Sequence, residues 1–549
     1  IELGSARNEY ESAQVVLTAY EDLQGIEAEV DPLIHSETGE EISASFRNRT
    51  RRRRGPIGLR WPRPAFHVRR GPDEGYPGNP DGLLVRPIRS LDAGSSQIIW
   101  LTTLVSEQAE PGVYTSELRV TAGGRTRAIP IELEVYDFTL PVQGLRNEGY
   151  MNPGLLFPPG ASPWSQRAHF LRLIRTLVEH RFDMVFLDGL NIFRHHICPE
   201  GGFEGIDKEG LLANEDGTVL LDASRFEYYV DLADRVSGDV ELMFNLRYNE
   251  VVGSRTPVGG LKEFKRSFPD RYEEDGERDL WAQELASLLK DYLERRDMLD
   301  RIIVKVADEP AGFDIWWDDH ALDAREAGLP ISTAFNSIDW AQAERALGAK
   351  MASFKPIYSA FDADFAERAQ AEGHMVGWYN CGPPPRHSIG TPPSELRSYY
   401  WQAARCDLDF VSRYGVMRWS TAGQTPETVW TAGRSNHFVL YPEHPDNPAY
   451  RIEGRGWVDT APIESIRFNL MRSGIEDAEY VFKLRRLIQE ARDAGENEAA
   501  ARAQAVLDRI WDDMFPSLLQ YRPPYEKLTE ARREVADAIL ELKNLLAGD

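Results

Sequence analysis

The segment that decides the fold is Arg301–Pro310, which reads RIIVKVADEP. Its first six residues contain four apolar side chains, Ile302, Ile303, Val304 and Val306. Such a run favours a strand buried on both faces of a parallel sheet. Two carboxylates, Asp308 and Glu309, end the run, and Pro310 cannot continue a central strand. α/β barrels hold their chemistry at this end of their strands, whereas an isolated Asp-Glu pair is often only a solvated turn.

The flanking sequence favours the barrel. From about Gly144, strand patterns alternate with amphipathic helices, as in a parallel sheet. Eight strands are predicted, at Asn147–Asn152, Phe182–Leu187, Asp239–Leu246, Arg301–Ala307, Ile331–Phe335, Met351–Ile357, His374–Tyr379 and Val411–Trp419. Helices are predicted between most of them, the first with Ser162 as N-cap and Pro163 at its first position. We therefore expect a TIM (β/α)8 barrel over residues 142–435, with the Asp308–Glu309 pair ending its fourth strand.

The parts on either side of the barrel have different patterns. Residues 1–141 contain several strand patterns and a hairpin signal at Gly123-Gly124, which together predict an N-terminal β-sandwich. Within this part, the Gly- and Pro-rich segment Gly55–Pro87 predicts a long loop. Residues 436–549 begin with a predicted strand at Phe438–Tyr441 and continue as helices, a C-terminal strand-plus-helix region. The expected fold class is thus multidomain α/β.

The composition of the chain argues against several classes of partner and cofactor. The chain has 549 residues and a net charge of −25, which argues against nucleic acid as a partner because a polyanion would repel it. No apolar run approaches the roughly 18 residues that a membrane span needs, so we expect no membrane insertion. Three cysteines form no disulfide framework, and no CxxC or HExxH spacing predicts a metal site, so we expect no cofactor. The chain begins inside a strand pattern, so the N-terminus does not reveal the compartment; the oligomeric state is also open.

Some segments have chemistry-bearing residues but weaker patterns. The basic stretch Arg47–Arg54 is most simply a solvated loop, and we assign it no function. His195, His196 and Cys198 have metal-ligand types but lie in an insertion without a second cluster. Cys381 follows the seventh strand without a neighbouring base in the sequence.

The predicted strand ends carry a set of polar and aromatic residues. They are Asn152, Asp188, Asn245, Arg247, Asp308, Glu309, Asn336, Tyr358, Trp378, Tyr379, Asn380, Trp419 and Ser420. Amides and carboxylates hydrogen-bond sugar hydroxyls, and aromatic rings stack on the apolar faces of sugars. Each aromatic by itself is explained by core packing, but their clustering at one rim indicates a carbohydrate site.

The distribution of acids at this rim is uneven. Glycoside cleavage usually needs two carboxylates, and strands six to eight end without one. Asp188 is an isolated candidate. One class of retaining glycosidase needs no enzymic nucleophile because the 2-acetamido oxygen of the substrate attacks the anomeric carbon. That mechanism needs one residue to hold the acetamido N–H and another to protonate the leaving oxygen. An adjacent Asp-Glu pair supplies both, and the charge of Asp308 would help to keep Glu309 protonated.

The chain resembles glycoside hydrolase family 123, the β-N-acetylgalactosaminidases and their relatives. The matching segments are RNEYESAQVVL, PGVYTSELRV, LEVYDFTLP, KVADEP, VGWYNCGPP, ELRSYYW, GVMRWS and SIRFNLMRSGIEDAEY, in the order of the family. The resemblance implies a sandwich, a catalytic barrel and a C-terminal region. It also implies that Asp308 orients the acetamido group, that Glu309 is the general acid/base, and that no metal is required.

The expected function is hydrolysis of a β-linked N-acetylgalactosamine from a glycan or glycoconjugate, with exo or endo action open. Tyr379 or Tyr358 is expected to hydrogen-bond the acetamido oxygen, and Trp378 and Trp419 to wall the sugar. The other expected lining residues are Asn245, Arg247, Asn336, Asn380 and Arg386. Two alternatives remain: a glycosidase on a non-acetamido sugar, with Glu309 as acid and Asp308 or Asp188 as its partner, and a non-catalytic glycan-binding protein.

Overall fold

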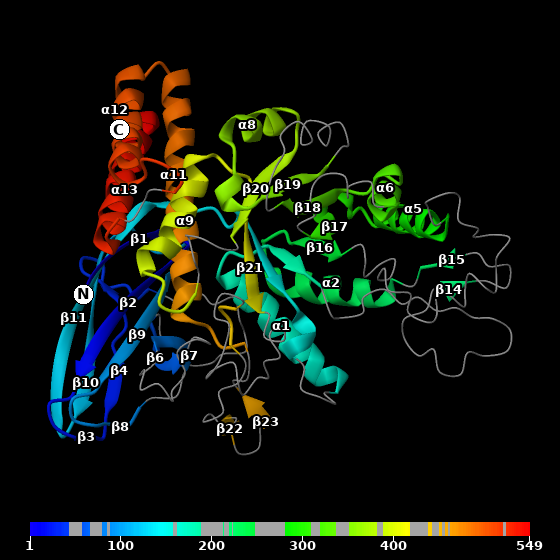
Figure 1. The fold of residues 1–549 in the computed structure, drawn as a ribbon. Coiled ribbons are helices and arrows are strands. Elements are labelled where there is room, and N and C mark those ends of the chain that lie inside the picture. Colours follow the sequence, from blue (N-terminus) through cyan, green and yellow to red (C-terminus); the bar gives the residue numbers. More distant parts are fainter. Residues whose placement is uncertain are drawn as a thin grey trace. The chain divides into compact units, whose positions relative to one another are not determined.

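The protein is represented by a computed structural model (Figure 1). It describes residues 1–42, 57–65, 79–84, 88–156, 162–187, 212–213, 219–221, 223–247, 280–308, 319–335, 351–380, 388–417, 438–441, 450–452, 456–458, 462–519 and 523–548. The chain forms two compact units. The first comprises Ile1–Leu145, Pro384–Asp407 and Trp419–Asp549, and the second comprises Arg146–Pro383 and Leu408–Arg418.

The second unit contains a closed barrel of eight strands, all parallel. In order around the barrel they are β12 (Arg146–Met151), β13 (Met184–Phe186), β16 (Met243–Arg247), β17 (Ile302–Asp308), β18 (Ile331–Phe335), β19 (Ser353–Pro356), β20 (Met375–Asn380) and β21 (Phe410–Met417). The sequence order equals the spatial order, and β21 pairs with β12 to close the ring. The prediction of eight strands, with β17 fourth, is confirmed.

Helices follow the strands of this unit. Those described are α1 (Pro163–Glu179), α2 (Ser224–Ser237), α5 (Leu280–Arg295), α6 (Asp319–Glu326) and α8 (Ala363–Ala371), together with the short helices η2 (Pro153–Leu156), η3 (Leu299–Arg301) and η5 (Tyr358–Ala360) and the small hairpin β14 (Leu212–Ala213) and β15 (Val219–Leu220). Ser162 caps α1 as predicted, because its side chain accepts a hydrogen bond from Ser165 N. The sequence also predicts a helix at Trp340–Leu347, between the fifth and sixth strands, and this segment lies outside the described residues.

Two antiparallel-rich sheets form the N-terminal part of the first unit. One sheet has the order β1-β11-β10-β4, with β5 also on β10, and the other has the order β2-β9-β6-β7. Their strands are β1 (Glu2–Arg7), β2 (Glu9–Thr18), β4 (Glu27–Val30), β5 (Ile34–His35), β6 (Ile57–Ala65), β7 (Asn79–Leu84), β9 (Ser96–Val105), β10 (Gly112–Ala122) and β11 (Arg125–Thr139), and β3 (Leu23–Gln24) pairs separately with β8 (Ser90–Leu91). Residues of both sheets, such as Ile99 and Leu133, share one buried apolar core, which confirms the predicted β-sandwich.

The loop prediction for Gly55–Pro87 is wrong, because β6 and β7 lie within it. Residues 57–60 of β6 pair with β9, whereas residues 61–65 pair with β7. Pro62 and Pro64 therefore fall in the half of β6 that has one neighbouring strand, where a missing N–H is tolerated. The proline content concealed this strand in the sequence.

In the remaining described part of the first unit there are four helices and the small hairpin β22 (Tyr450–Ile452) and β23 (Gly456–Val458). They are α9 (Pro393–Arg405), α11 (Ile466–Asp493), α12 (Asn497–Met514) and α13 (Tyr525–Ala547). α9 lies between the seventh and eighth barrel strands in the chain, yet it packs along α11. Phe438–Tyr441 does not form the predicted strand; Tyr441 makes one isolated bridge with Ile463.

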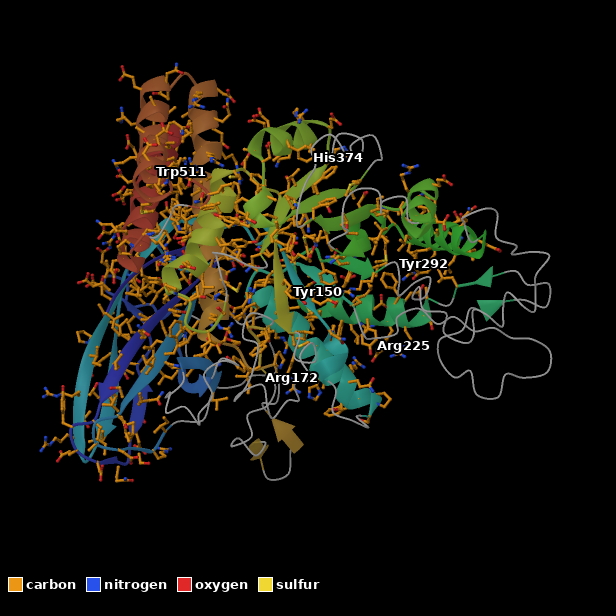
Figure 2. All side chains as sticks on the ribbon, viewed as in Figure 1. Tyr150, Arg172, Arg225, Tyr292, His374 and Trp511 are labelled. Atoms are coloured by element: carbon orange, nitrogen blue, oxygen red, sulfur yellow. The ribbon has the colours of Figure 1, made fainter. Side chains whose placement is uncertain are left out.

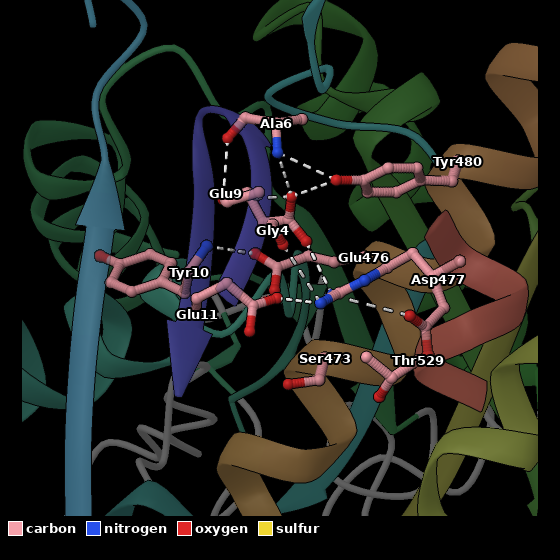
Figure 3. A network of polar contacts seen from close by, with 12 residues as sticks. Gly4, Ala6, Glu9, Tyr10, Glu11, Ser473, Glu476, Asp477, Tyr480 and Thr529 are labelled. Carbon is pink, nitrogen blue, oxygen red and sulfur yellow. Dashed lines mark hydrogen bonds and ion pairs between the residues drawn. The ribbon is translucent and has the colours of Figure 1, made fainter. Parts of the chain in front are cut away.

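A buried network of charged residues joins the sandwich to these helices within the first unit (Figure 3). Arg532 donates from Nη1 to Glu9 Oε1 at 2.9 Å and also pairs with Glu11. Tyr480 donates its hydroxyl to Glu9 Oε2 at 2.5 Å. Asp477 accepts two hydrogen bonds from Arg397, at 2.8 and 2.7 Å. Since buried charges are tolerated only when they are paired, this network fixes the helices against β1 and β2.

Across the part of the chain that is described, no helix has both the length and the apolar composition of a membrane span. The two compact units do not test the division at residues 141 and 435, which stays a prediction.

Candidate active site

The predicted catalytic pair lies at the end of the fourth strand. Asp308 is the last residue of β17 and pairs with Ala334 of β18, whose own partner on β19 is Lys355. The register of β17 shifts between Lys305 and Ala307, an irregularity of the kind that re-aims residues near active sites. The backbone of Asp308 is described but its side chain is not, and Glu309 lies outside the described residues.

The base of the barrel interior is apolar. Met184, Met243, Ile303 and Phe410 form a buried cluster, with Met375 packed against it. These residues come from five of the eight strands, and in four of the five, β16, β17, β20 and β21, a polar residue follows two or more positions later. The interior is therefore filled below the site, as in other small barrels.

A buried ion pair lies above this base. Lys355 Nζ donates to Glu148 Oε1 at 2.5 Å, and Ser412 Oγ donates to the same oxygen at 2.7 Å. Lys355 and Glu148 are each about 97% buried, with 3% of their surface exposed. Because β12 and β19 are not neighbours in the ring, this contact spans the interior of the barrel.

Nearer the carboxyl ends of the strands, charged and aromatic residues gather around Tyr150 (labelled in Figure 2). The ring of Tyr150 lies 4.9 Å from that of Phe186 and 5.8 Å from that of Tyr414. The Arg247 guanidinium carbon lies 4.6 Å from its centroid, and Lys305 Nζ lies 5.8 Å from it. We call these five residues the Tyr150 cluster. Both cations lie within the distance at which an aromatic ring attracts a positive charge.

Asn245, a predicted sugar-binding amide, lies two residues before Arg247 of the Tyr150 cluster on β16. It is 1% exposed, and its Nδ2 has no hydrogen-bond partner among the residues that the structure describes. Phe186 is its neighbour on β13, and Arg247 follows two residues later on the same face of β16. A buried amide donor without a partner is costly, so a donor at this position has capacity for a ligand or water.

The predicted residues of β20 divide between the two faces of the strand. Tyr379 pairs with Ser412, whose hydroxyl is directed to Glu148, so Tyr379 shares the inner face. Trp378 is fully buried and packs edge-on against Tyr358, with ring centroids 4.7 Å apart, and against Phe361 at 5.0 Å. Asn380 is also buried, and its Oδ1 has no hydrogen-bond partner within the described ranges.

Other predicted residues cannot be placed. Asn336, Arg386 and Trp419 lie outside the described residues, as do Asp188, Cys381, His195, His196 and Cys198. Their roles stay predictions. Among the residues that are described, no group of three or more His, Cys, Asp or Glu side chains could hold a metal ion.

Sequence reasoning missed the charged interior of the barrel. Glu148, Lys305 and Lys355 lie within the predicted strands, but their place in the barrel interior was not predicted from the sequence. The available signal was a single charged residue in the middle of a predicted barrel strand, at the period-two position of the inner face. Tyr150 was missed because it lies inside the first predicted strand and not at its end.

The comparisons with known proteins agree with this architecture. The family model described as glycoside hydrolase 123, catalytic domain, matches residues 210–484, just over half of the chain. A family 123 glycoside hydrolase from Clostridium perfringens, whose structure was solved to explain glycolipid glycan hydrolysis, has a TM-score of 0.65 and 14% sequence identity. The alignment covers 100% of this chain and 94% of that chain, which shows a shared fold.

Other solved structures have much lower structural similarity to this chain. A methyltransferase from Methanosarcina mazei has a TM-score of 0.32 at 12% identity, over 50% of this chain and 87% of that chain. A β-glucuronidase from Parabacteroides merdae has a TM-score of 0.24 at 10% identity, over 66% of this chain and 42% of that chain. Scores this low carry no argument. No curated protein matches the sequence. On the match of its catalytic region to the family model, the chain belongs to glycoside hydrolase family 123.

Proposed function

We propose that this chain is a retaining hydrolase of β-linked N-acetylgalactosamine and that the 2-acetamido group of the substrate is its nucleophile. The observation that carries the proposal is the position of Asp308 at the carboxyl end of the fourth barrel strand, with Glu309 next in the chain. This is the edge at which barrel enzymes bind substrate. Family membership supports glycoside hydrolysis, and the choice of sugar comes from the sequence resemblance.

The proposed reaction has two steps. In the first, the acetamido oxygen attacks the anomeric carbon while Asp308 accepts a hydrogen bond from the acetamido N–H. Glu309 gives its proton to the departing glycosidic oxygen, so the aglycone leaves as an alcohol, and an oxazolinium ion forms whose N–H is still hydrogen-bonded to the Asp308 carboxylate. In the second, Glu309 takes a proton from water, and the water oxygen attacks the anomeric carbon and opens the oxazolinium ring, which restores the acetamido group. Two displacements return the β configuration.

The two carboxyl groups must therefore differ in charge at the start: Asp308 ionised and Glu309 protonated. The charges of the neighbouring strands are consistent with this division. Lys305 precedes Asp308 by three residues on β17, and Arg247 pairs with Lys305 from β16. Cations favour the ionised form of a nearby carboxylate, whereas a like charge disfavours a second ionisation beside it.

The geometry of β20 refines the choice of partner for the acetamido oxygen. Tyr379 shares the inner face of the strand with the Glu148 layer, whereas Tyr358 is buried against Trp378. We therefore assign the acetamido contact to Tyr379. Asn245 is the second proposed hydrogen-bond donor, since its buried Nδ2 has no partner in the described structure.

The test is hydrolysis of 4-nitrophenyl β-glycosides of N-acetylgalactosamine, N-acetylglucosamine, galactose and glucose. We expect turnover only of an acetamido sugar. In each single variant kcat/KM should fall about a thousandfold or more, because Glu309→Gln removes the general acid and Asp308→Asn removes the charge that stabilises the transition state. Turnover of a plain hexoside at a comparable rate would refute substrate assistance and indicate an enzymic nucleophile. Binding without turnover, unchanged in Glu309→Gln, would refute the enzymatic assignment.

A further inference from the structure

The described surface of the barrel unit carries two exposed large apolar side chains, Trp164 and Tyr228. Trp164 is 78% exposed and Tyr228 is 44% exposed. The burial of a tryptophan side chain is strongly favourable, so an indole left in water at a fixed helical position is unusual. Single exposed apolar residues are common on protein surfaces, but these two lie near the N-termini of consecutive barrel helices.

Both residues lie in the N-terminal parts of barrel helices, Trp164 in the first turn and Tyr228 in the second. Trp164 is the second residue of α1, which follows β12, and Tyr228 is the fifth residue of α2, which follows β13 in the barrel order. In a parallel barrel, the helix that follows a strand begins at the carboxyl edge of that strand, the edge that carries Asp308 at the end of β17. Trp164 and Tyr228 therefore belong to the same edge of the barrel as the proposed catalytic pair.

The two helices are neighbours, as Figure 1 also shows. The rings of Phe170 on α1 and Tyr229 on α2 lie 4.8 Å apart, and Tyr228 is adjacent to Tyr229 in the chain. Trp164 precedes Phe170 by six residues, about 9 Å of helix at the usual rise. The two exposed rings therefore lie on neighbouring helices, on the N-terminal side of the Phe170–Tyr229 contact.

We propose that Trp164 forms an aromatic platform for a sugar unit beyond the one that is cleaved, with Tyr228 on the neighbouring helix as a second contact. The natural substrate class would then be an oligosaccharide or glycoconjugate rather than a monosaccharide glycoside. This inference rests on the proposed function, because it assigns a further contact for the same substrate. An aromatic face suits this occupant since the C–H face of a pyranose is apolar while its hydroxyls stay in water.

A rigid helix position also suits the role. Trp164 lies between the N-cap Ser162, bonded to Ser165 N, and the buried turn that contains His169 and Phe170. Its backbone is therefore ordered before a ligand binds, which lowers the entropy cost of stacking. Replacing such an exposed ring should not affect folding.

The test compares two substrates in Trp164→Ala. One is a tetrasaccharide that ends in β-linked N-acetylgalactosamine, and the other is the 4-nitrophenyl glycoside of that sugar. We expect kcat/KM for the tetrasaccharide to fall about fivefold, the range of one aromatic stacking contact, with kcat/KM for the aryl glycoside unchanged. Trp164→Phe should keep most of the activity, and Tyr228→Ala should give a smaller loss.

Tyr20→Ala is the matched control, because Tyr20 is an exposed aromatic at 93% but belongs to the first unit. It should behave as the wild type on both substrates. An equal fall on both substrates, or no fall on either, would overturn the platform. So would a loss confined to a glycolipid in vesicles, which would identify a contact with the lipid surface.

A binding measurement separates this inference from the proposed function. Calorimetry with the tetrasaccharide on Glu309→Gln and on Glu309→Gln/Trp164→Ala does not require turnover. A Kd about five times weaker in the double variant supports the platform even if no acetamido sugar is hydrolysed. Equal Kd values, or no binding by either variant, overturn it.

Discussion

Lys355 Nζ lies 2.5 Å from Glu148 Oε1 inside the barrel, where both side chains are almost fully buried. The pair connects the sixth strand to the first. A buried ion pair recovers its desolvation cost only while both partners are present, so the effect of a substitution depends on whether one charge or both are removed.

We predict that Lys355→Met lowers the free energy of unfolding by about 3 to 5 kcal/mol, because it leaves Glu148 charged and unpaired in the interior. Lys355→Met/Glu148→Met should recover more than half of that loss, since it removes both buried charges. Urea unfolding with a constant m-value measures both. A double variant less stable than the single one would contradict this account. The surface pair Arg502–Glu541 is a control, and breaking it should cost less than about 1 kcal/mol.

Glu9 should make the stability of the first unit depend on pH. Burial raises the pKa of Glu9 from 4.5 to about 8, although Arg532 next to it acts in the opposite direction. The folded state then binds more protons than the unfolded state between these values. The contribution of Glu9 to the free energy of unfolding is therefore fully present below about pH 4.5 and falls by up to about 1.4 kcal/mol per pH unit as the pH rises toward 8.

Glu9→Gln removes this titration, so its unfolding free energy should decline less steeply between pH 5 and 8 than that of the wild type. The variant will also be less stable at every pH, because its amide NH2 group faces the donors Ala6 N and Arg532. The difference in slope is the readout, and Glu21→Gln, at an exposed acid of the same unit, is the control. Parallel curves for Glu9→Gln and wild type would show that Glu9 stays ionised throughout.

Substitution of Asn245 tests whether this residue contacts the substrate or only stabilises the barrel core. Its Nδ2 makes no hydrogen bond in the described part of the chain, so Asn245→Leu, which keeps the branching and the number of heavy atoms, should leave the free energy of unfolding within about 1 kcal/mol of the wild type or raise it. If Asn245 binds substrate, kcat/KM should fall about tenfold or more for the loss of one buried hydrogen bond. A large loss of stability with normal kcat/KM would assign Asn245 to the core instead.

A cyclic inhibitor tests the role of Asp308. A thiazoline fused to N-acetylgalactosamine imitates the proposed oxazolinium ion and should compete with substrate, because enzymes bind such analogues more tightly than substrates. Asp308→Asn should weaken this inhibitor about a hundredfold, whereas Asp308→Asn should change the binding of unmodified galactose little. Equal inhibition of both proteins would exclude contact between Asp308 and the nitrogen of the ring.

The local patterns that found the barrel strands were short apolar runs followed by polar residues, and β17 is the best case. Ile302, Ile303 and Val304 are buried, and the strand ends at Asp308 as the two carboxylates and Pro310 require. Ser162 and Pro163 located the start of α1 by the same local chemistry. Patterns of this kind predict elements because the causes lie within a few residues.

The pairing of charges across the barrel could not be predicted in this way. Glu148 and Lys355 are separated by 207 residues, and only the closure of the ring brings them together. Similarly, α9 has the amphipathic pattern of a barrel helix, but it packs on α11, where Arg397 pairs with Asp477.

The sequence by itself determined the classes of element, their order, and the placement of Asp308 at the end of the fourth strand, because backbone propensity and period-two burial act locally. The tertiary structure alone decided which residues share the barrel interior and which buried charges are neutralised. Both depend on contacts between distant segments, and electrostatic energy in a buried site depends on those distances and not on spacing in the chain.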